Sequence, residues 1–524
     1  MKVLVADPIA QSGIDIIKKT AEVDVKTKLS EEQLVNIIGD YDALVVRSQT
    51  QVTANVINAG HKLTIIGRAG VGVDNIDVSA ATERGIIVAN APTGNTVSAA
   101  EHAIALMLAL ARHIPQANYS LKSGQWKRAD FMGTEVKGKI LGIVGLGNIG
   151  REVARRARGL EMKILAYDPF VSEERAGQLQ AEMVSLETLY READFITLHT
   201  PLTDSTRNMI DTPQLETMKP SARIINAARG GLINEEALIK ALDEGKLAGA
   251  AIDVFCVEPC TQSILFSSDK IIVTPHLGAS TTEAQVLAAT EVAQQIVDVL
   301  NGQPARYAVN APFISAEAMS VLGPYMKVAN VVGQLTSYLG EGNLRKIKIK
   351  YNGDIASYNT NALKASILGG LLDRMSEERV NMVNANTIAQ RRGIQVIEEK
   401  EASCENFANL ITLDVETSEG EVSVSGTVLR GEPHIVKVNE FWIDIVPTGK
   451  YFLFSDHLDR PGLIGAVGRI TGEADVNVSH MHLSREKPRG RALMIMALDE
   501  PLKEEDRQKI LQVPDINNVK LVQL

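Results

Sequence analysis

Short apolar runs that end in Gly, Asp, Ser or Asn alternate with helical patterns along the first part of the chain. The runs are KVLVAD, ALVVRS, TIIGRAG and IIVANAP. This alternation is typical of β-α-β units that build a parallel sheet. The pattern therefore predicts a small α/β domain. A helix then opens at GNTVSAAEHAIALMLALAR, with Asn95 or Thr96 as its N-cap.

A second α/β unit begins near Lys137. Its predicted strands end in KILGIVG, KILAYD, DFITLHT, ARIINAA, LAGAAIDVF and KIIVTPH. Apolar runs of this length, separated by helical patterns, favour a doubly wound dinucleotide-binding fold. A helix from about residue 281 to residue 300 is expected to return to the first domain.

The pattern changes after residue 312. Helices and alternating strands fill 313–447, which predicts an α+β domain, and a β-α-β-β-α-β order over 448–524 predicts a ferredoxin-like domain. The expected class is α/β, with two doubly wound parallel-sheet domains followed by these two. The predicted boundaries are 1–98 plus 286–312 for the first domain and 99–285 for the second.

Composition narrows the class of protein. The chain has 524 residues, 45% hydrophobic and 23% charged, which predicts a globular protein of several domains. A net charge of −10 without a basic block argues against nucleic acid as a partner. Three cysteines suit a reducing, cytoplasmic compartment, and no metal site is predicted because Cys256 and Cys260 lack a second ligand pair. The apolar helix at 102–111 is too short for a membrane span, and the N-terminus starts as a strand rather than a signal peptide.

The segment GIVGLGNIG places Gly145, Gly147 and Gly150 in a G-x-G-x-x-G pattern between a predicted strand and a predicted helix. In this context the glycines allow a tight turn, a close approach to a pyrophosphate and close helix packing. The amides of Asn148 and Ile149 would meet the phosphates. Asp168 ends the next strand, where a carboxylate accepts from ribose hydroxyls, so NAD is predicted over NADP.

Four charged residues stand at predicted strand ends, which is where open parallel sheets bind ligands: Arg229, Asp253, Glu258 and His276. Taken singly, each has a structural interpretation, such as an ion pair, a solvated loop acid or a packed histidine. Together they fit oxidation of a 2-hydroxy acid. A guanidinium holds the carboxylate, a histidine takes the hydroxyl proton, and an acid orients the histidine.

The motifs GLGNIG, YDP, LHTPLTDSTRNMI, INAARGGLINEEAL, AIDVFCVEP and TPHLGAST closely resemble the D-isomer-specific 2-hydroxyacid dehydrogenase family, over roughly Lys2 to Pro312. The resemblance implies an NAD-dependent oxidoreductase with Arg229, Glu258 and His276 as its catalytic residues. It also implies an NAD site that comprises the glycine motif, Asn148, Ile149, Asp168, Thr200, Ala227, Ala228, Arg229, Asp253, His276, Leu277, Gly278 and Ala279.

Polar residues of the first domain narrow the choice of substrate. Arg47, Ser48, Arg68 and Asn95 follow its strands, and two arginines facing a cleft suit a phosphate, although ordinary surface ion pairs are an alternative. RAGVGVDNID with NAPTGNTVSAAEH resembles the branch of the family that oxidises 3-phospho-D-glycerate with NAD⁺ in the first step of serine synthesis. Two alternatives remain open: a dehydrogenase of an unphosphorylated D-2-hydroxy acid, and a catalytically silent NAD-sensing regulator.

The tail DHLDRPGLIGAVGRITGEADVNVSHMHL resembles an ACT domain, a small effector-binding module. The resemblance implies serine as effector, held across a domain dimer by His457, Asp459 and Asn477, and a homo-oligomer that is a dimer or a tetramer. A dimerisation module without a ligand is the alternative. RVNMVNANTIAQRRGI resembles the intervening domain of long family members.

Overall fold

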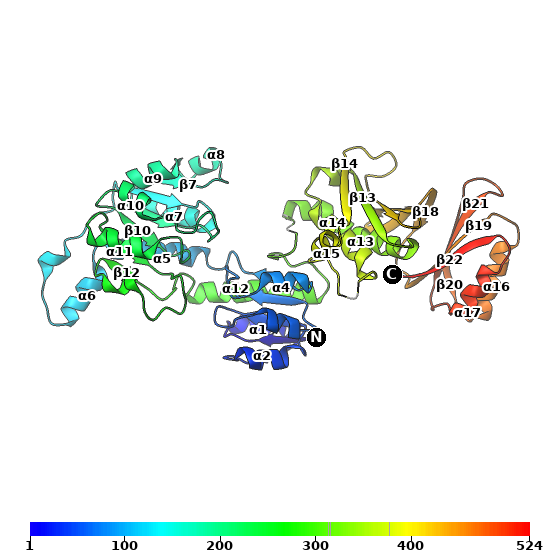
Figure 1. The fold of residues 1–524 in the computed structure, drawn as a ribbon, viewed down its shortest axis with the longest axis horizontal. Helices are drawn as coiled ribbons and strands as arrows, with labels where there is room; N and C mark the ends of the chain where they lie inside the picture. Colours follow the sequence, from blue (N-terminus) through cyan, green and yellow to red (C-terminus); the bar gives the residue numbers. More distant parts are fainter. Residues whose placement is uncertain (313, 315, 377) are drawn as a thin grey trace.

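The computed structural model describes residues 1–312, 314, 316–376 and 378–524, which fold around four sheets. Figure 1 shows the sheets as separate lobes along an elongated molecule. The α/β class and the two parallel sheets predicted from the sequence are confirmed. The four predicted domain boundaries stay predictions, and the one at residue 313 falls outside the described residues.

The first lobe is a parallel five-stranded sheet in the order β2-β1-β3-β4-β5. All four residues of β3 are buried because helices cover both faces. The elements are β1 (Lys2–Val5), α1 (Gln11–Ile17), β2 (Glu22–Val25), α2 (Glu31–Ile38), β3 (Ala43–Val46), α3 (Ala54–Ala59), β4 (Ile65–Arg68), α4 (Val78–Glu83) and β5 (Ile87–Asn90).

The second lobe is a parallel seven-stranded sheet in the order β12-β11-β10-β9-β6-β7-β8. Its strands are β6 (Ile140–Val144), β7 (Lys163–Tyr167), β8 (Ala181–Met183), β9 (Phe195–Leu198), β10 (Arg223–Asn226), β11 (Gly249–Ile252) and β12 (Ile271–Val273). Its helices are α5 (Thr96–Ala111), α6 (Ile114–Lys122), α7 (Asn148–Gly159), α8 (Glu173–Gly177), α9 (Leu186–Glu192), α10 (Thr212–Thr217) and α11 (Glu235–Asp243), with 3₁₀ turns η1 (Arg128–Phe131) and η2 (Ile264–Ser267).

Helix α12 (Thr282–Leu300) returns from the second lobe to the first, as Figure 1 shows. Val292 and Ile296 lie in one core with Val3 and Val5 of β1. A Cβ on Gly67 would lie 2.5 Å from Val292 Cγ1, so the glycine permits the close approach of helix and sheet. The returning helix and α5 therefore form the covalent connections between the two lobes.

The third lobe has a mixed six-stranded sheet in the order β14-β13-β15-β16-β17-β18. Burial alternates along β15, so one face packs against helices and the other is more accessible. The elements are α13 (Ala316–Leu339), β13 (Leu344–Gly353), η3 (Asp354–Ser357), α14 (Asn361–Asp373), α15 (Ala385–Arg391), β14 (Gln395–Glu401), β15 (Asn409–Thr417), β16 (Glu421–Leu429), β17 (Glu432–Val438) and β18 (Phe441–Ile445).

The fourth lobe is antiparallel, with the order β20-β21-β19-β22 expected of a ferredoxin-like fold. Phe452 and Phe454 of β19 pack into the core of the third lobe, whereas Leu453 packs under the helices of the fourth. The elements are β19 (Tyr451–Leu458), α16 (Leu463–Glu473), β20 (Val478–Arg485), β21 (Arg491–Leu498), α17 (Glu504–Leu511) and β22 (Ile516–Gln523).

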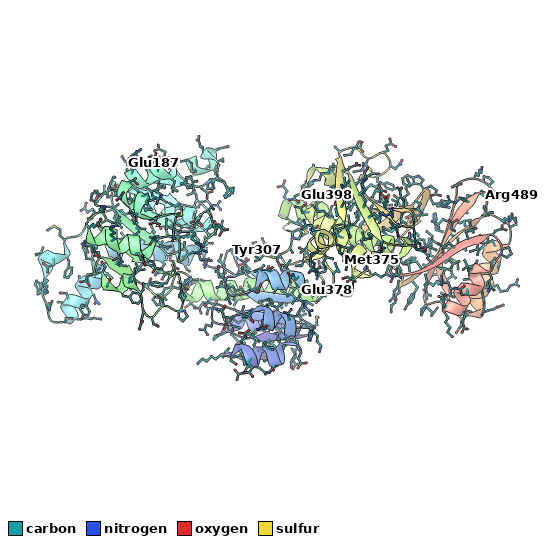
Figure 2. All side chains as sticks on the ribbon, in the orientation of Figure 1. Glu187, Tyr307, Met375, Glu378, Glu398 and Arg489 are labelled. Carbon is teal, nitrogen blue, oxygen red and sulfur yellow. The ribbon has the colours of Figure 1, made fainter. Side chains whose placement is uncertain are left out.

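A polar contact joins the third lobe to the first. Asn381 Nδ2 donates to Gly85 O at 2.7 Å and Asn384 Nδ2 donates to Glu83 O at 3.2 Å, at the carboxyl end of α4. Figure 2 labels Glu378, three residues before Asn381, on the side of the third lobe near this contact. Among the described residues, no single helix is long and apolar enough to cross a bilayer, although the bent pair α5 and α6 passes a test of length and composition.

Candidate active site

The predicted catalytic residues follow three neighbouring parallel strands. Arg229 comes after β10, Glu258 after β11 and His276 after β12. Because the carboxyl ends of parallel strands meet at one edge of the sheet, these loops lie side by side. The sheet topology alone thus brings together residues that are far apart in the chain.

His276 and Glu258 form a direct pair. His276 Nδ1 donates to Glu258 Oε2 at 2.6 Å, and the Phe255 N–H donates to Glu258 Oε1 at 3.0 Å. Partial burial raises the pKa of the Glu258 carboxyl, but these two hydrogen bonds outweigh it and hold the pKa below its ordinary value. An ionised Glu258 fixes the Nδ1–H tautomer of the ring, which leaves Nε2 free to exchange a proton.

Asn226, the last residue of β10, shapes the turn that carries Arg229. Its buried amide donates from Nδ2 to Arg229 O at 2.8 Å, and its Oδ1 accepts from the Ala228 N–H at 3.1 Å. A Cβ on Gly230 would lie 2.0 Å from Phe255 O, so only glycine lets this turn lie against the loop of Glu258. Asn226 is not among the residues predicted from the sequence, although a polar residue that ends an apolar strand is a visible signal.

Positive charge gathers where the first lobe meets the second. Arg68, at the end of β4, donates from Nε to Asn75 Oδ1 at 2.9 Å. Burial, together with the positive charges of Arg229 and Arg47, lowers the pKa of Arg68 to about 10. Arg229 Nε lies 3.6 Å from Asp74 Oδ2, which comes from the first lobe. Arg68 and Arg229 thus contact two consecutive residues of the first lobe, Asn75 and Asp74, and guanidinium groups at one such segment suit a ligand that carries more than one negative charge.

The other predicted substrate residues also stand at the edge of the first sheet. The Arg47 N–H donates to Asp7 Oδ2 at 2.6 Å, which orients the backbone after β3, and the following Ser48 is exposed. Asn95 precedes α5 and its side chain does not cap the helix. Within the described part of the chain, its buried Oδ1 has no hydrogen-bond partner, which is unusual for a buried polar atom.

The glycine motif has the geometry that a dinucleotide needs. Gly145 has a φ of +95°, and a Cβ on Gly150 would lie 2.0 Å from Gly145 O. A Cβ on Gly147 would meet nothing within 4 Å, so there is open space beside this position. Helix α7 starts at Asn148 with no side-chain cap and no acidic residue in its first turn. The N–H groups of Asn148 and Ile149 are therefore free of a competing anion, and the chain fits a pyrophosphate here.

Asp168 follows β7 and braces the same loop. Its Oδ2 accepts from the Leu146 N–H and its Oδ1 from the Phe170 N–H, each at 2.8 Å. After β9, Thr200 Oγ1 donates to Met209 Sδ at 3.9 Å, next to a partly buried His199 whose pKa burial lowers to about 4. A neutral His199 keeps this side of the predicted nucleotide site uncharged at neutral pH.

The loop that follows β12 completes the predicted NAD site. Asp253 is fully buried, and its carboxylate accepts from the Leu277 N–H at 2.8 Å and the Gly278 N–H at 3.0 Å. Ala279 follows in the same loop, and Ala227 is partly buried against the core, with its carbonyl oxygen 3.9 Å from where a Cβ on Gly278 would lie. Among the described residues, no group of three or more His, Cys, Asp or Glu side chains is arranged to hold a metal ion.

The three predicted serine ligands are each engaged within the fourth lobe. His457 is buried and lies with Nδ1 3.2 Å from Ser455 O. Asp459 accepts from Arg485 Nη1 at 2.8 Å, and Asn477 donates to Asp499 Oδ2 at 2.6 Å. His457 pairs with Ala492, whereas Asn477 precedes Val478, which pairs with Leu498, so one chain places Asn477 at the opposite end of the sheet from His457.

The chain matches two protein families. Residues 104–278 match the D-isomer specific 2-hydroxyacid dehydrogenase, NAD binding domain, and residues 321–439 match the D-3-phosphoglycerate dehydrogenase intervening domain. The site thus belongs to an NAD-dependent dehydrogenase of the D-isomer-specific 2-hydroxyacid class.

Relatives along the whole chain narrow this class. D-3-phosphoglycerate dehydrogenase of Synechocystis sp. is 50% identical over 100% of this chain and 95% of its own length, and that of Archaeoglobus fulgidus is 44% identical over 100% of both. A glyoxylate reductase structure from Paecilomyes thermophila covers 59% of this chain and 98% of its own, at 30% identity and a TM-score of 0.55. The chain belongs to the D-3-phosphoglycerate dehydrogenase family.

Proposed function

We propose that the chain oxidises 3-phospho-D-glycerate to 3-phosphooxypyruvate with NAD⁺, the first step of serine biosynthesis. The observation that carries the proposal is the His276–Glu258 hydrogen bond of 2.6 Å, at the sheet edge that also bears Arg229. An oriented imidazole and a guanidinium at one strand edge suit the oxidation of an alcohol next to a carboxylate.

The proton moves through the imidazole. His276 Nε2 takes the proton of the C2 hydroxyl, and the resulting imidazolium is stabilised by the ionised Glu258 at Nδ1. Bound NAD⁺ supplies the acceptor for the hydride that leaves C2, so the products are the 2-oxo acid, NADH and one proton. In the reverse direction His276 is the general acid, and Arg229 polarises the keto oxygen.

In this proposal, the positive charges of the site select the substrate. Arg229 holds the C1 carboxylate, and Arg47, Ser48, Arg68 and Asn95 hold the phosphate from the first lobe. Support comes from the pKa of Arg68, which burial and the positive charges of Arg229 and Arg47 lower to about 10 although the carboxylates of Asp74 and Asp7 act in the opposite direction. A substrate with a carboxylate at one end and a phosphate at the other neutralises such a cluster from both sides.

The test compares two acids in one variant. Arg47→Ala should raise KM for 3-phosphoglycerate about tenfold to a hundredfold, since it removes a charge-assisted contact, while kcat/KM for D-glycerate changes less than twofold. The exposed Lys62 of the same lobe offers a matched control, Lys62→Ala, with both substrates unaffected. Equal losses with both acids would assign the enzyme to an unphosphorylated 2-hydroxy acid. Absence of NADH formation with every hydroxy acid would instead indicate an NAD-sensing regulator.

The proposal extends to regulation and assembly. Serine is the effector of the fourth lobe, the enzyme is a cytoplasmic homo-oligomer, and paired fourth lobes complete the serine site. The ferredoxin-like topology supports this, and so does the separation of the three residues: His457 and Asp459 lie at the carboxyl end of β19, whereas Asn477 precedes β20 at the opposite end of the sheet, so a second lobe is needed to bring them to one ligand. Millimolar serine should slow hydrogen exchange in residues 457–477 of the full chain, and unchanged exchange would leave the lobe a structural role.

A further inference from the structure

Helix α5 places a histidine beside the loop of the proposed base. His102 lies on the second turn of α5, with 19% of its side chain exposed. Its Nε2 lies 3.1 Å from Asp253 Oδ1, which directly follows β11. Because the fully buried carboxylate accepts hydrogen bonds, this nitrogen is the N–H donor of the pair.

The Asp253 carboxylate organises the loop that follows β12. Oδ1 also accepts from Thr274 Oγ1 at 2.6 Å and from the Leu277 N–H at 2.8 Å, and Oδ2 accepts from the Gly278 N–H at 3.0 Å. The His276 N–H donates to Asp253 O at 2.8 Å. Residues 274–278 are therefore tied to Asp253 through both its backbone and its side chain.

The donors to this carboxylate are of two kinds. Thr274, Leu277 and Gly278 belong to the loop itself, so they move whenever the loop moves. Among the described residues, His102 is the donor that comes from a separate helix. The hydrogen bond from His102 therefore holds the Asp253 carboxylate in place relative to the sheet. The carboxylate in turn holds the loop. One turn before it on α5, Ser98 Oγ lies 2.6 Å from Thr281 Oγ1, where the same loop enters α12.

The backbone conformation of His276 depends on this support of the loop. His276 has a φ of +53°, a left-handed conformation that a residue with a Cβ adopts only when its surroundings hold it. The direction of the imidazole depends on this backbone, and so does the 2.6 Å contact with Glu258. A loop that relaxes to a negative φ would turn the ring away from Glu258.

We propose that His102 is a positioning residue for the reaction: from α5 it holds Asp253, and Asp253 holds the loop that aims His276. The inference rests on the proposed function, in which His276 exchanges the proton. His102 does not touch substrate in this account; its effect passes through the Asp253 carboxylate, and through Thr274 Oγ1 at 3.4 Å from the same Nε2, to the backbone of residues 276–278.

Two amide variants of the full-length enzyme test the inference. A glutamine amide reaches nearly as far along the side chain as His Nε2, whereas an asparagine amide is one carbon shorter. His102→Asn should therefore lose the donor to Asp253 and His102→Gln should keep it. We expect His102→Asn to lower kcat about tenfold to a hundredfold, as a base displaced by about 1 Å does, with KM for 3-phosphoglycerate within twofold. We expect kcat of His102→Gln to stay within threefold of the parent.

Hydrogen exchange separates positioning from general stability. In His102→Asn, the Leu277 and Gly278 amides should exchange about tenfold faster than in His102→Gln, at an unchanged melting temperature. Equal kcat and equal amide exchange in the two variants would overturn the proposal, as would loss of kcat in both variants by global unfolding. If His276→Ala retains full turnover, the proposed function fails, yet the exchange measurement still tests whether His102 holds the loop.

Discussion

The carboxyl edge of the second sheet and the turn before α16 in the fourth lobe both carry predicted ligand residues, yet they are built differently. At the sheet edge, loops after neighbouring strands bond to one another, as His276 does to Glu258. In the fourth lobe, the predicted ligands bond to other groups, as Asp459 does to Arg485. The loops of the sheet edge are held to one another within one chain, whereas the fourth lobe keeps His457 and Asn477 at opposite ends of its sheet.

The strands beneath the two sites explain this difference. All of β10 is buried because helices cover both faces of its sheet, so its loops can only converge at the edge. Strand β20 lies at the edge of the fourth sheet and exposes Met481 and Leu483, 42% and 37% accessible. An edge strand with exposed apolar residues offers its backbone to another strand.

The largest effect is expected at the sheet edge. His276→Ala should lower kcat by about three orders of magnitude, within the range for loss of a general acid–base group. NADH affinity, measured by fluorescence titration, should stay within about twofold, since the fold of the Asp253 loop rests on backbone donors. Glu258→Gln should cost less, because it leaves the ring in place. If His276→Ala turned over substrate at the parent rate, His276 would not be the base, and the contrast drawn between this sheet edge and the fourth lobe would fail.

A smaller effect is expected in the glycine motif, where one variant tests contact with the ligand and the other tests packing. Gly147→Ala places a Cβ in open space, so its melting temperature should equal that of the parent while KM for NAD⁺ rises about tenfold through contact with the pyrophosphate. Gly150→Ala places a Cβ 2.0 Å from Gly145 O and should lower the free energy of unfolding by about 1–3 kcal/mol. Thermal unfolding and steady-state kinetics on the two variants check the pair; a melting temperature lowered equally in both would contradict it.

Sequence patterns predict the parts of this molecule that are buried on both sides. Continuous apolar runs mark the central parallel strands, and the ferredoxin-like order of the last lobe is visible in its alternation. Edge strands are predicted less well, and three of them, β2, β8 and β14, are absent from the apolar runs identified in the sequence. Strand β2 (EVDV) and strand β14 (QVIEEKE) are largely exposed and charged, so their apolar signal is weak.

The residues of the candidate site also divide into those that the sequence predicts and those that only the structure reveals. Arg229, Glu258 and His276 stand after apolar runs, where sequence and chemistry together single them out. Asn226 and His102 act through contacts with residues 3 and 151 positions away, since Asn226 bonds Arg229 and His102 bonds Asp253. In the sequence His102 is one polar residue on an apolar helix, and only the approach of α5 to β11 gives it a partner.

The smallest effect tests the fourth lobe itself. The Asp459 carboxylate, whose pKa the Arg485 guanidinium and the Arg489 N–H hold below its ordinary value, would have to exchange Arg485 for the ammonium group of serine. Arg485→Gln removes this internal competitor, so half-maximal inhibition by serine should need about two- to fivefold less effector, in keeping with an exposed ion pair. Lys509→Gln, which breaks the ion pair with Asp506 on α17, should leave the serine response unchanged. An unaltered or weaker response in Arg485→Gln would mean that Asp459 serves the lobe by bracing β20 rather than by binding an amine.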